Sequence, residues 1–189
     1  MNHGPISLFL VLCGVAVGAA EDEAGARLET ATVDLAQNSH LEALDWMVGQ
    51  WVDRGEDSTI TTECSWTKNR KFLKRSFKVK IDEEVTLEGN QFVGWDPAAG
   101  RIRSWTFDSE GGIGEGVWIQ DGNRWLVKAS FVLADGARAS AVNVYTRVDD
   151  ATIRWQSTNR EIAGELQPNI PEVTVVRQKS QESRKEESQ

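Results

Sequence analysis

From Gly49 onwards, hydrophobic and polar residues alternate with a period of two, which is the pattern of strands that bury one face. Short runs rich in Val, Ile, Thr, Trp and Phe are separated by turn residues such as Asp96-Pro97 and Asp121-Gly122. The connections are too short for crossover helices, so neighbouring strands should be antiparallel. The predicted strands span residues 50–54, 59–67, 71–81, 85–96, 102–108, 112–120, 123–133, 137–148, 152–162 and 171–177.

A succession of about ten short strands without helices between them indicates an all-β fold. No long return connection interrupts the hairpins, so we predict an antiparallel up-and-down barrel. Before the strands, Leu41, Leu44 and Val48 share one face at helical spacing, and Ser39 is a suitable N-cap. Residues 39–48 are therefore predicted as a short helix that plugs or flanks one end of the barrel.

The alternation also predicts which side chains point into the barrel. A one-residue error in register would invert each assignment, because successive side chains point to opposite faces. On the strand at 71–81, Arg75 falls on the same face as the apolar residues. The expected inward residues are Leu73, Arg75, Phe77, Val79, Ile81, Trp125, Val127, Phe131, Leu133, Ala139, Ala141, Asn143 and Tyr145. Lys74, Lys78, Lys80 and Lys128 should face solvent.

The first 20 residues contain no Asp, Glu, Lys or Arg and include an apolar run at residues 8–17. This run is too short to span a bilayer. With the small residues Gly18, Ala19 and Ala20 behind it, it is typical of a secretory signal peptide cleaved after Ala20. The alternatives are a buried hydrophobic N-terminus and a lipoprotein signal, although Leu12 is not the small residue that the latter needs before Cys13.

The domain organisation follows from these patterns. Residues 1–20 are predicted as the signal peptide, 21–38 as a tether and 39–177 as the barrel domain. Residues 178–189 contain no apolar side chain, so they are predicted as a disordered polar tail. We expect an exported protein that is periplasmic or extracellular, with no membrane insertion after signal cleavage.

Composition narrows the partners and the cofactors. The net charge of −8 argues against nucleic acid, which requires clustered Lys and Arg. After signal cleavage His40 and Cys64 are the only His and Cys, so neither a metal nor another cofactor is predicted, and no internal disulfide can form. Cys64 shares a strand face with Ile60 and Trp66 and is expected to be a small buried hydrophobe.

Gly49-Gln50-Trp51, after a short helix, resembles the opening of the lipocalin and calycin barrels. A larger part of the chain resembles a family of uncharacterised bacterial calycin-like domains, the type also found fused behind SnoaL-like domains. That resemblance covers residues 39–177 and rests on residues 41–51, 94–97, 104–112 and 114–118. It implies a barrel in which Gly49 and Trp51 are structural residues at one end, and it implies no established activity.

Nitrobindin-like haem barrels share this opening and bind iron through a His on a late strand. The chain has no His in its strand region, because His40 lies in the predicted helix, where it should be exposed. A haem site of that kind is therefore not expected.

The chain contains eight Trp, spread through the predicted strands, which either pack the core or line a ligand cavity. We therefore weigh three functions: a binder of a small, mostly apolar ligand; a structural or interaction module of the cell envelope with a filled interior; and a SnoaL- or cyclase-like enzyme. The enzyme would need Glu63, Glu88 or Glu115 to point inward beside Arg75. No nucleophile–base pair is found, so no catalytic residue is assigned and a non-enzymatic role is favoured. The predicted ligand-binding residues are Arg75, Phe77, Trp105, Trp118, Trp125, Asn143 and Tyr145. The oligomeric state and the identity of the ligand are left open.

Overall fold

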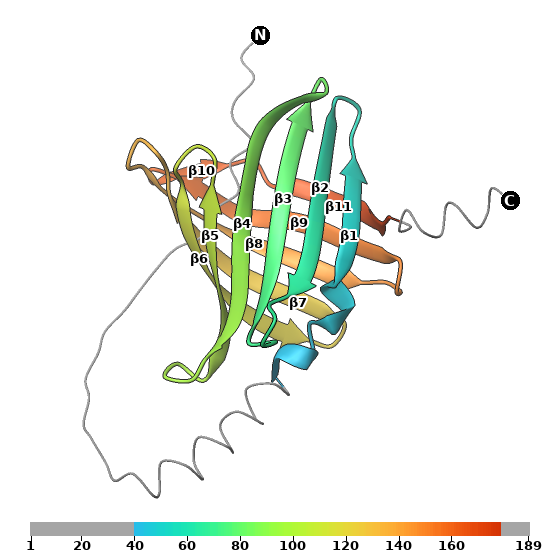
Figure 1. Ribbon diagram of the computed structural model, residues 1–189. Coiled ribbons are helices and arrows are strands. Elements are labelled where there is room, and N and C mark those ends of the chain that lie inside the picture. Colours follow the sequence, from blue (N-terminus) through green and yellow to red (C-terminus); the bar gives the residue numbers. More distant parts are fainter. Residues whose placement is uncertain (1–39, 179–189) are drawn as a thin grey trace, which may run out of the picture.

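The computed structural model describes residues 40–178, and almost all of them lie in strands or tight turns (Figure 1). The strands are β1 (Gly49–Arg54), β2 (Ser58–Trp66), β3 (Phe72–Ile81), β4 (Glu84–Asp96), β5 (Arg101–Asp108), β6 (Ile113–Asp121), β7 (Arg124–Val132), β8 (Arg138–Arg147), β9 (Thr152–Ile162), β10 (Glu165–Gln167) and β11 (Ile170–Arg177). The predicted signal peptide and tether, and residues 179–189 of the predicted tail, lie outside the described residues.

The strands form one closed antiparallel barrel. Each strand from β1 to β9 pairs with the next, and β11 pairs with both β9 and β1, which closes a ring of ten strands. The predicted all-β, up-and-down architecture is therefore confirmed. In Figure 1, β1 to β5 stand upright side by side at the front of the molecule, with neighbours in opposite directions, and β8, β9 and β11 cross behind them.

The three-residue strand β10 is a feature that the sequence pattern missed. It pairs with the end of β9, through Glu165 opposite Ile162, along the same edge that β11 occupies further back. Pro168 separates β10 from β11, and proline has no N–H to donate to a ladder. The final stretch therefore enters the barrel as two short strands.

The segment before β1 is helical but not one continuous helix. Residues 40–42 form a first turn, and Asp45–Met47 form the 3₁₀ helix η1. The amide of Leu44 donates to the carbonyl of Leu41, and that of Met47 to the carbonyl of Leu44, each at 2.9 Å. These bonds put Leu41, Leu44 and Met47 on one side, and all three are buried. No helix within residues 40–178 is both long and apolar enough to cross a membrane.

This helical segment closes one barrel end, which we call the helix end. Its buried side chains join inward residues from β1 to β9 in a single apolar cluster. The buried members are Leu41, Leu44, Met47, Trp51, Cys64, Leu73, Val93, Ile102, Trp118, Trp125, Val127, Tyr145 and Ile153.

Arg177 fastens the helical segment to the barrel. Its guanidinium lies 4.2 Å from the ring of Trp51 and donates hydrogen bonds to the carbonyls of Trp46 (2.9 Å) and Val48. The indole of Trp51 donates to the carbonyl of Met47 at 2.8 Å. Gly49 has a φ of +124°, and a Cβ there would lie 2.3 Å from the Arg177 guanidinium, so only glycine fits this junction. Gly49 and Trp51 thus lie at the helix end.

The opposite end of the barrel, which we call the open end, lies away from the helical segment. A smaller apolar cluster of Ala129, Phe131, Ala139 and Ala141 lies on β7 and β8, toward this end. The inward residues nearest the open end are only partly buried. They are Ile60, Ile81, Leu87, Leu133 and Ile162.

Candidate functional site

Between the helix-end cluster and the open end, the barrel interior holds several polar side chains, among them Ser157, which is buried opposite Asn143. Six of the others are called the polar belt: Arg75, Gln91, Ser104, Thr106, Asn143 and Tyr145. All six occupy inward positions, because the register pairs Arg75 with Gln91, Gln91 with Thr106, and Thr106 with the glycine at the inward position of β6. Apart from Arg75 they are buried. Polar groups at this depth are tolerated only when they find partners, so their hydrogen bonds determine what the belt can do.

Hydrogen bonds fix one side of the belt. The amide of Gln91 donates through Nε2 to Thr106 Oγ1 at 3.0 Å, and Trp118 Nε1 donates to Ser104 Oγ at 3.0 Å. Because its nitrogen is used in this way, Gln91 presents its oxygen to Arg75, whose Nη1 donates to Oε1 at 3.1 Å. The strands β4 and β5 therefore hold Arg75 in one orientation.

Tyr145 holds Arg75 from the other side. Arg75 Nη1 donates to the hydroxyl of Tyr145 at 3.1 Å, and the guanidinium lies 5.4 Å from the tyrosine ring. The Tyr145 ring stacks in turn on Trp118, with centroids 5.7 Å apart. Both hydrogen bonds of Arg75 to oxygen thus come from the same nitrogen, and both acceptors are neutral.

Arg75 has no carboxylate partner within residues 40–178. None of the ion pairs among the described residues joins Arg75 to an Asp or Glu. Burial acts to lower the pKa of the guanidinium, but Tyr145 and Cys64 together outweigh burial, and the net pKa lies above its ordinary value. The group is therefore a full positive charge inside the barrel at neutral pH, surrounded by protein but only partly buried by accessible surface.

Asn143 contributes a hydrogen-bond acceptor that has no donor, whereas Arg75 contributes donors. It is 3 % exposed, and its Oδ1 has no hydrogen-bond partner among the described residues. It lies two residues before Tyr145 on the inward face of β8, so the two side chains are neighbours along the strand. A buried carbonyl oxygen left without a donor is costly.

Some inward positions between the belt and the open end carry small residues, whereas others carry Phe77, Val79 and Phe131. Gly114 and Gly116 lie on β6 opposite Phe131 and Ala129, and Ala141 follows on β8. Small inward residues in a ring of ten strands contribute little side-chain volume to the interior. This composition distinguishes the open half of the barrel from the Trp-rich helix end.

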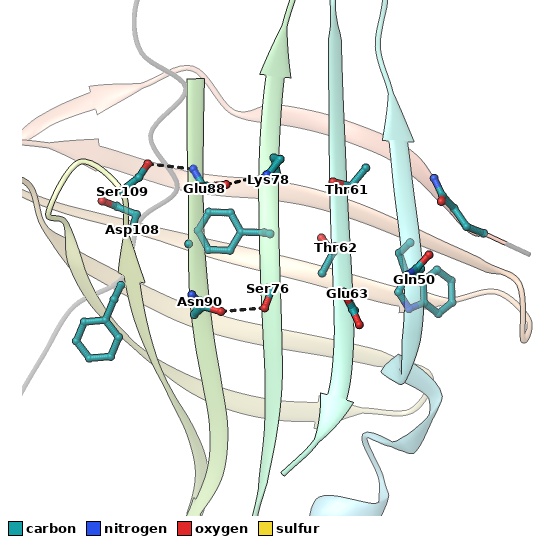
Figure 2. Close-up of a pocket in the computed structure, with 15 residues that line it drawn as sticks. Gln50, Thr61, Thr62, Glu63, Ser76, Lys78, Glu88, Asn90, Asp108 and Ser109 are labelled. Carbon is teal, nitrogen blue, oxygen red and sulfur yellow. Dashed lines mark hydrogen bonds and ion pairs between the residues drawn. The ribbon is translucent and has the colours of Figure 1, made fainter. Parts of the chain in front are cut away.

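A separate groove of about 790 Å³ lies along β1 to β5 (Figure 2). Most of its lining residues occupy outward positions, and one ion pair lies within it. Lys78 pairs with Glu88 at 2.9 Å, and Ser76 donates to Asn90 at 2.8 Å. This groove lies mainly on the outer face of the barrel, in contrast to the polar belt.

The structure brings together most, but not all, of the residues predicted to bind a ligand. Arg75, Phe77, Trp118, Trp125, Asn143 and Tyr145 all lie at inward positions. Trp105 lies on the outer face instead, because its strand neighbours Ser104 and Thr106 point inward, and its ring is 5.6 Å from the guanidinium of Arg103. Trp105 is therefore separated from the interior set.

None of the three carboxylates that the enzyme alternative would need faces Arg75. Glu63 is exposed, Glu88 pairs with Lys78 on the outer face, and Glu115 pairs with Arg103. The register puts each of these positions on the opposite face from Arg75. The buried acid that the enzyme hypothesis required is thus missing from these positions.

Cys64 and His40 lie where the sequence predicted. Cys64 is 3 % exposed, and burial raises the pKa of its thiol to about 11, although the nearby Arg75 acts to lower it. His40 is exposed and stacks on the ring of Trp95, with centroids 4.1 Å apart.

Sequence reasoning missed Gln91, Ser104 and Thr106. A signal was present, because these polar residues occur at the inward positions of strands whose other inward members are apolar. Comparison of the chain with protein-family models and with curated proteins found no match.

Proposed function

We propose that this is an exported protein that binds a small, mostly apolar molecule inside its barrel. The observation that carries the proposal is Arg75, a charged side chain inside the barrel whose hydrogen-bond partners are neutral and whose surface is not fully covered. Desolvating such a charge in the interior of a protein costs roughly several kcal/mol of folding free energy unless an oppositely charged group binds to it. A barrel with no need of a partner would be more stable with an apolar residue there.

The division of the barrel into two halves supports the same function. The helix end is packed with large side chains and gives a rigid floor. The half above the polar belt has small inward residues and partly buried apolar ones at the open end, such as Ile60 and Leu133. Ligand sites are typically apolar with a few fixed polar groups, which this arrangement provides.

Tryptophan fluorescence tests the proposal, because Trp118 lies against the polar belt while Trp105 lies outside the barrel. The protein, expressed with its own leader and purified, is titrated with long-chain alcohols and polycyclic aromatic compounds. We expect saturable quenching that the Trp105→Phe variant retains and that Trp118→Phe reduces. Absence of saturable quenching across the whole panel would contradict a ligand-binding role.

The alternative of an interaction module has one observation in its favour. Phe107, Ile113 and Val132 are paired across β5, β6 and β7 and are 50 %, 55 % and 37 % exposed. Adjacent exposed apolar residues of this kind mark contact surfaces. If quenching is absent and Ile113→Lys changes the sedimentation of the protein or of a complex isolated with it, the interaction module becomes the better account.

A further inference from the structure

Arg75 and its neighbours restrict which kinds of ligand the barrel can bind. This inference rests on the proposed function. A guanidinium has five N–H donors. The two hydrogen bonds to Gln91 and Tyr145 both leave from Nη1. Within residues 40–178, the remaining nitrogens have no oxygen acceptor, and only the Cys64 thiol lies within reach. Apart from the contact with the Cys64 thiol, the donors on Nε and Nη2 are therefore available to an incoming acceptor.

The hydroxyl of Tyr145 adds another donor at the same place. Its oxygen accepts from Arg75, which leaves its proton to be donated, and no acceptor for it is found within the described residues. An acceptor beside Arg75 Nη2 would thus meet donors from two walls of the barrel. Charge-assisted hydrogen bonds to a guanidinium are stronger than neutral ones, and an anion would neutralise it.

The single positive charge of Arg75 indicates that the ligand carries a single negative charge. Arg75 is the one cation of the polar belt, whose other members are neutral. A phosphate dianion would retain a net negative charge in the interior, whereas a carboxylate would cancel the charge of Arg75 and match its planar geometry. The walls on either side of the belt are apolar, so the rest of the ligand should be apolar as well.

Asn143 requires a hydrogen-bond donor on the ligand, whereas Arg75 requires an acceptor. Its Oδ1 is buried without a donor, one inward position along β8 from Tyr145. A ligand with a hydroxyl or amide N–H close to its carboxylate could satisfy this oxygen while its carboxylate binds Arg75. An unsubstituted acid would leave Asn143 unsatisfied.

We infer that the barrel binds an amphipathic carboxylic acid, whose carboxylate accepts hydrogen bonds from Arg75 and Tyr145 and whose adjacent hydroxyl or amide N–H donates to Asn143. Gln91, Ser104 and Thr106 are positioning residues in this site, because they hold Arg75 and would not touch the ligand. The apolar chain of the acid would lie toward the open end, among the small inward residues of β6 to β8.

The test compares ligands that differ in one group. Dodecanoic acid, dodecanol, β-hydroxydodecanoic acid and dodecyl phosphate are titrated calorimetrically into the purified full-length protein at neutral pH. We expect dodecanoic acid to bind about 10–100-fold more tightly than dodecanol, because of the charged hydrogen bonds. The β-hydroxy acid should bind several-fold more tightly still, and dodecyl phosphate more weakly than dodecanoic acid.

Two variants assign these differences to residues. Arg75→Met should abolish the preference for acid over alcohol. The substitution also leaves Gln91 Oε1 without its donor, so the melting temperature and the retained binding of dodecanol check that the variant is folded. Asn143→Leu should abolish the advantage of the β-hydroxy acid over dodecanoic acid. Lys74→Met is the matched control, because it removes a positive charge from the same strand but at an outward position, and it should preserve both preferences.

The outcomes separate this inference from the proposed function. Equal binding of acid and alcohol by the wild-type protein, or tighter binding of the phosphate, would overturn the assignment of a carboxylate while leaving a ligand-binding barrel in place. A preference that survives in Arg75→Met would also overturn it. If none of the four compounds binds and the panel of alcohols and aromatic compounds causes no quenching, both this inference and the proposed ligand-binding function are contradicted.

Discussion

Three arginines illustrate how the surroundings of a single residue decide its role. Arg103, near the outer surface, is balanced by Asp96 and Glu115, and Arg177 binds backbone carbonyls and the face of Trp51. Arg75 has the same side chain but only neutral partners inside a barrel. Arg103 and Arg177 stabilise the fold through these contacts. The position of Arg75 is explained better by a bound partner that the chain does not contain.

The thiol of Cys64 should be unreactive in the folded protein. Burial raises its pKa to about 11, so at pH 8 about one molecule in a thousand carries the thiolate that reacts with iodoacetamide. We expect peptide mass spectrometry to find Cys64 unmodified after exposure at pH 8 in buffer and modified after the same exposure in guanidinium. Equal labelling rates in the two conditions would contradict the buried position.

Replacing Gly49 with alanine should destabilise the barrel by about 1–3 kcal/mol. The backbone there has a φ of +124°, and the added Cβ would displace the Arg177 guanidinium from the carbonyls of Trp46 and Val48. Urea unfolding measures the loss. Gly122→Ala is a suitable control: its φ of +60° is also positive, but nothing lies within 4 Å of the added Cβ. A similar loss in both variants would mean that the Arg177 contact contributes nothing.

At the scale of elements, the strands could be predicted well because one physical rule governs them all. Each strand buries one face, so the alternation of apolar residues gave nearly the observed bounds, from β1 to β11. Strand β10 escaped that rule, because it is too short to show a period. The predicted short helix before β1 is present, and spacings of three bring its Leu41, Leu44 and Met47 onto the barrel.

The candidate site could be predicted only in part, for the same reason. The period of two correctly placed Arg75, Asn143 and Tyr145 inside but says nothing about which strands face each other across the barrel. The contact between Arg75 and Tyr145 joins residues 70 positions apart and depends on closure of the sheet. Trp105 was predicted to bind the ligand because it is a tryptophan, although its alternation with Ser104 and Thr106 puts it on the outer face when those two residues point inward. The prediction therefore failed to separate the inner from the outer face.

The turn between β4 and β5 should depend on pH through Asp96. A hydrogen bond from Arg103 lowers the pKa of this carboxyl, helped by the amides of Ala99 and Ala98. A lowered pKa means that Asp96 stabilises the fold above the ordinary aspartate pKa, and that this contribution disappears as the pH falls through the lowered value.

Asp96→Asn should therefore cost about 1 kcal/mol at neutral pH, and the difference in melting temperature from the wild type should shrink as the pH is lowered from 5 toward 2. Asp121→Asn serves as the control. Its carboxylate pairs only with the exposed Arg124 across a hairpin, so little change is expected at any pH. A pH-independent difference for Asp96→Asn would contradict a role for its charge.

At the scale of the whole molecule, the barrel has two unlike ends. Arg177 and the helical segment seal one end against a large apolar cluster, so that end contributes rigidity. The other end has small inward residues and partly buried apolar ones, with the polar belt as a boundary between the halves. A sealed floor, a polar layer whose charge has only neutral hydrogen-bond partners and a partly exposed apolar end are features that a ligand-binding barrel would use.

The central claim, that the barrel carries a ligand, is tested most directly by native mass spectrometry of the protein purified from the cells that produce it. We predict a reproducible added mass that disappears on denaturation and is missing from Arg75→Met prepared in the same way. A bare mass for the wild-type protein, in preparations gentle enough to preserve weak complexes, would contradict the account and favour the interaction module.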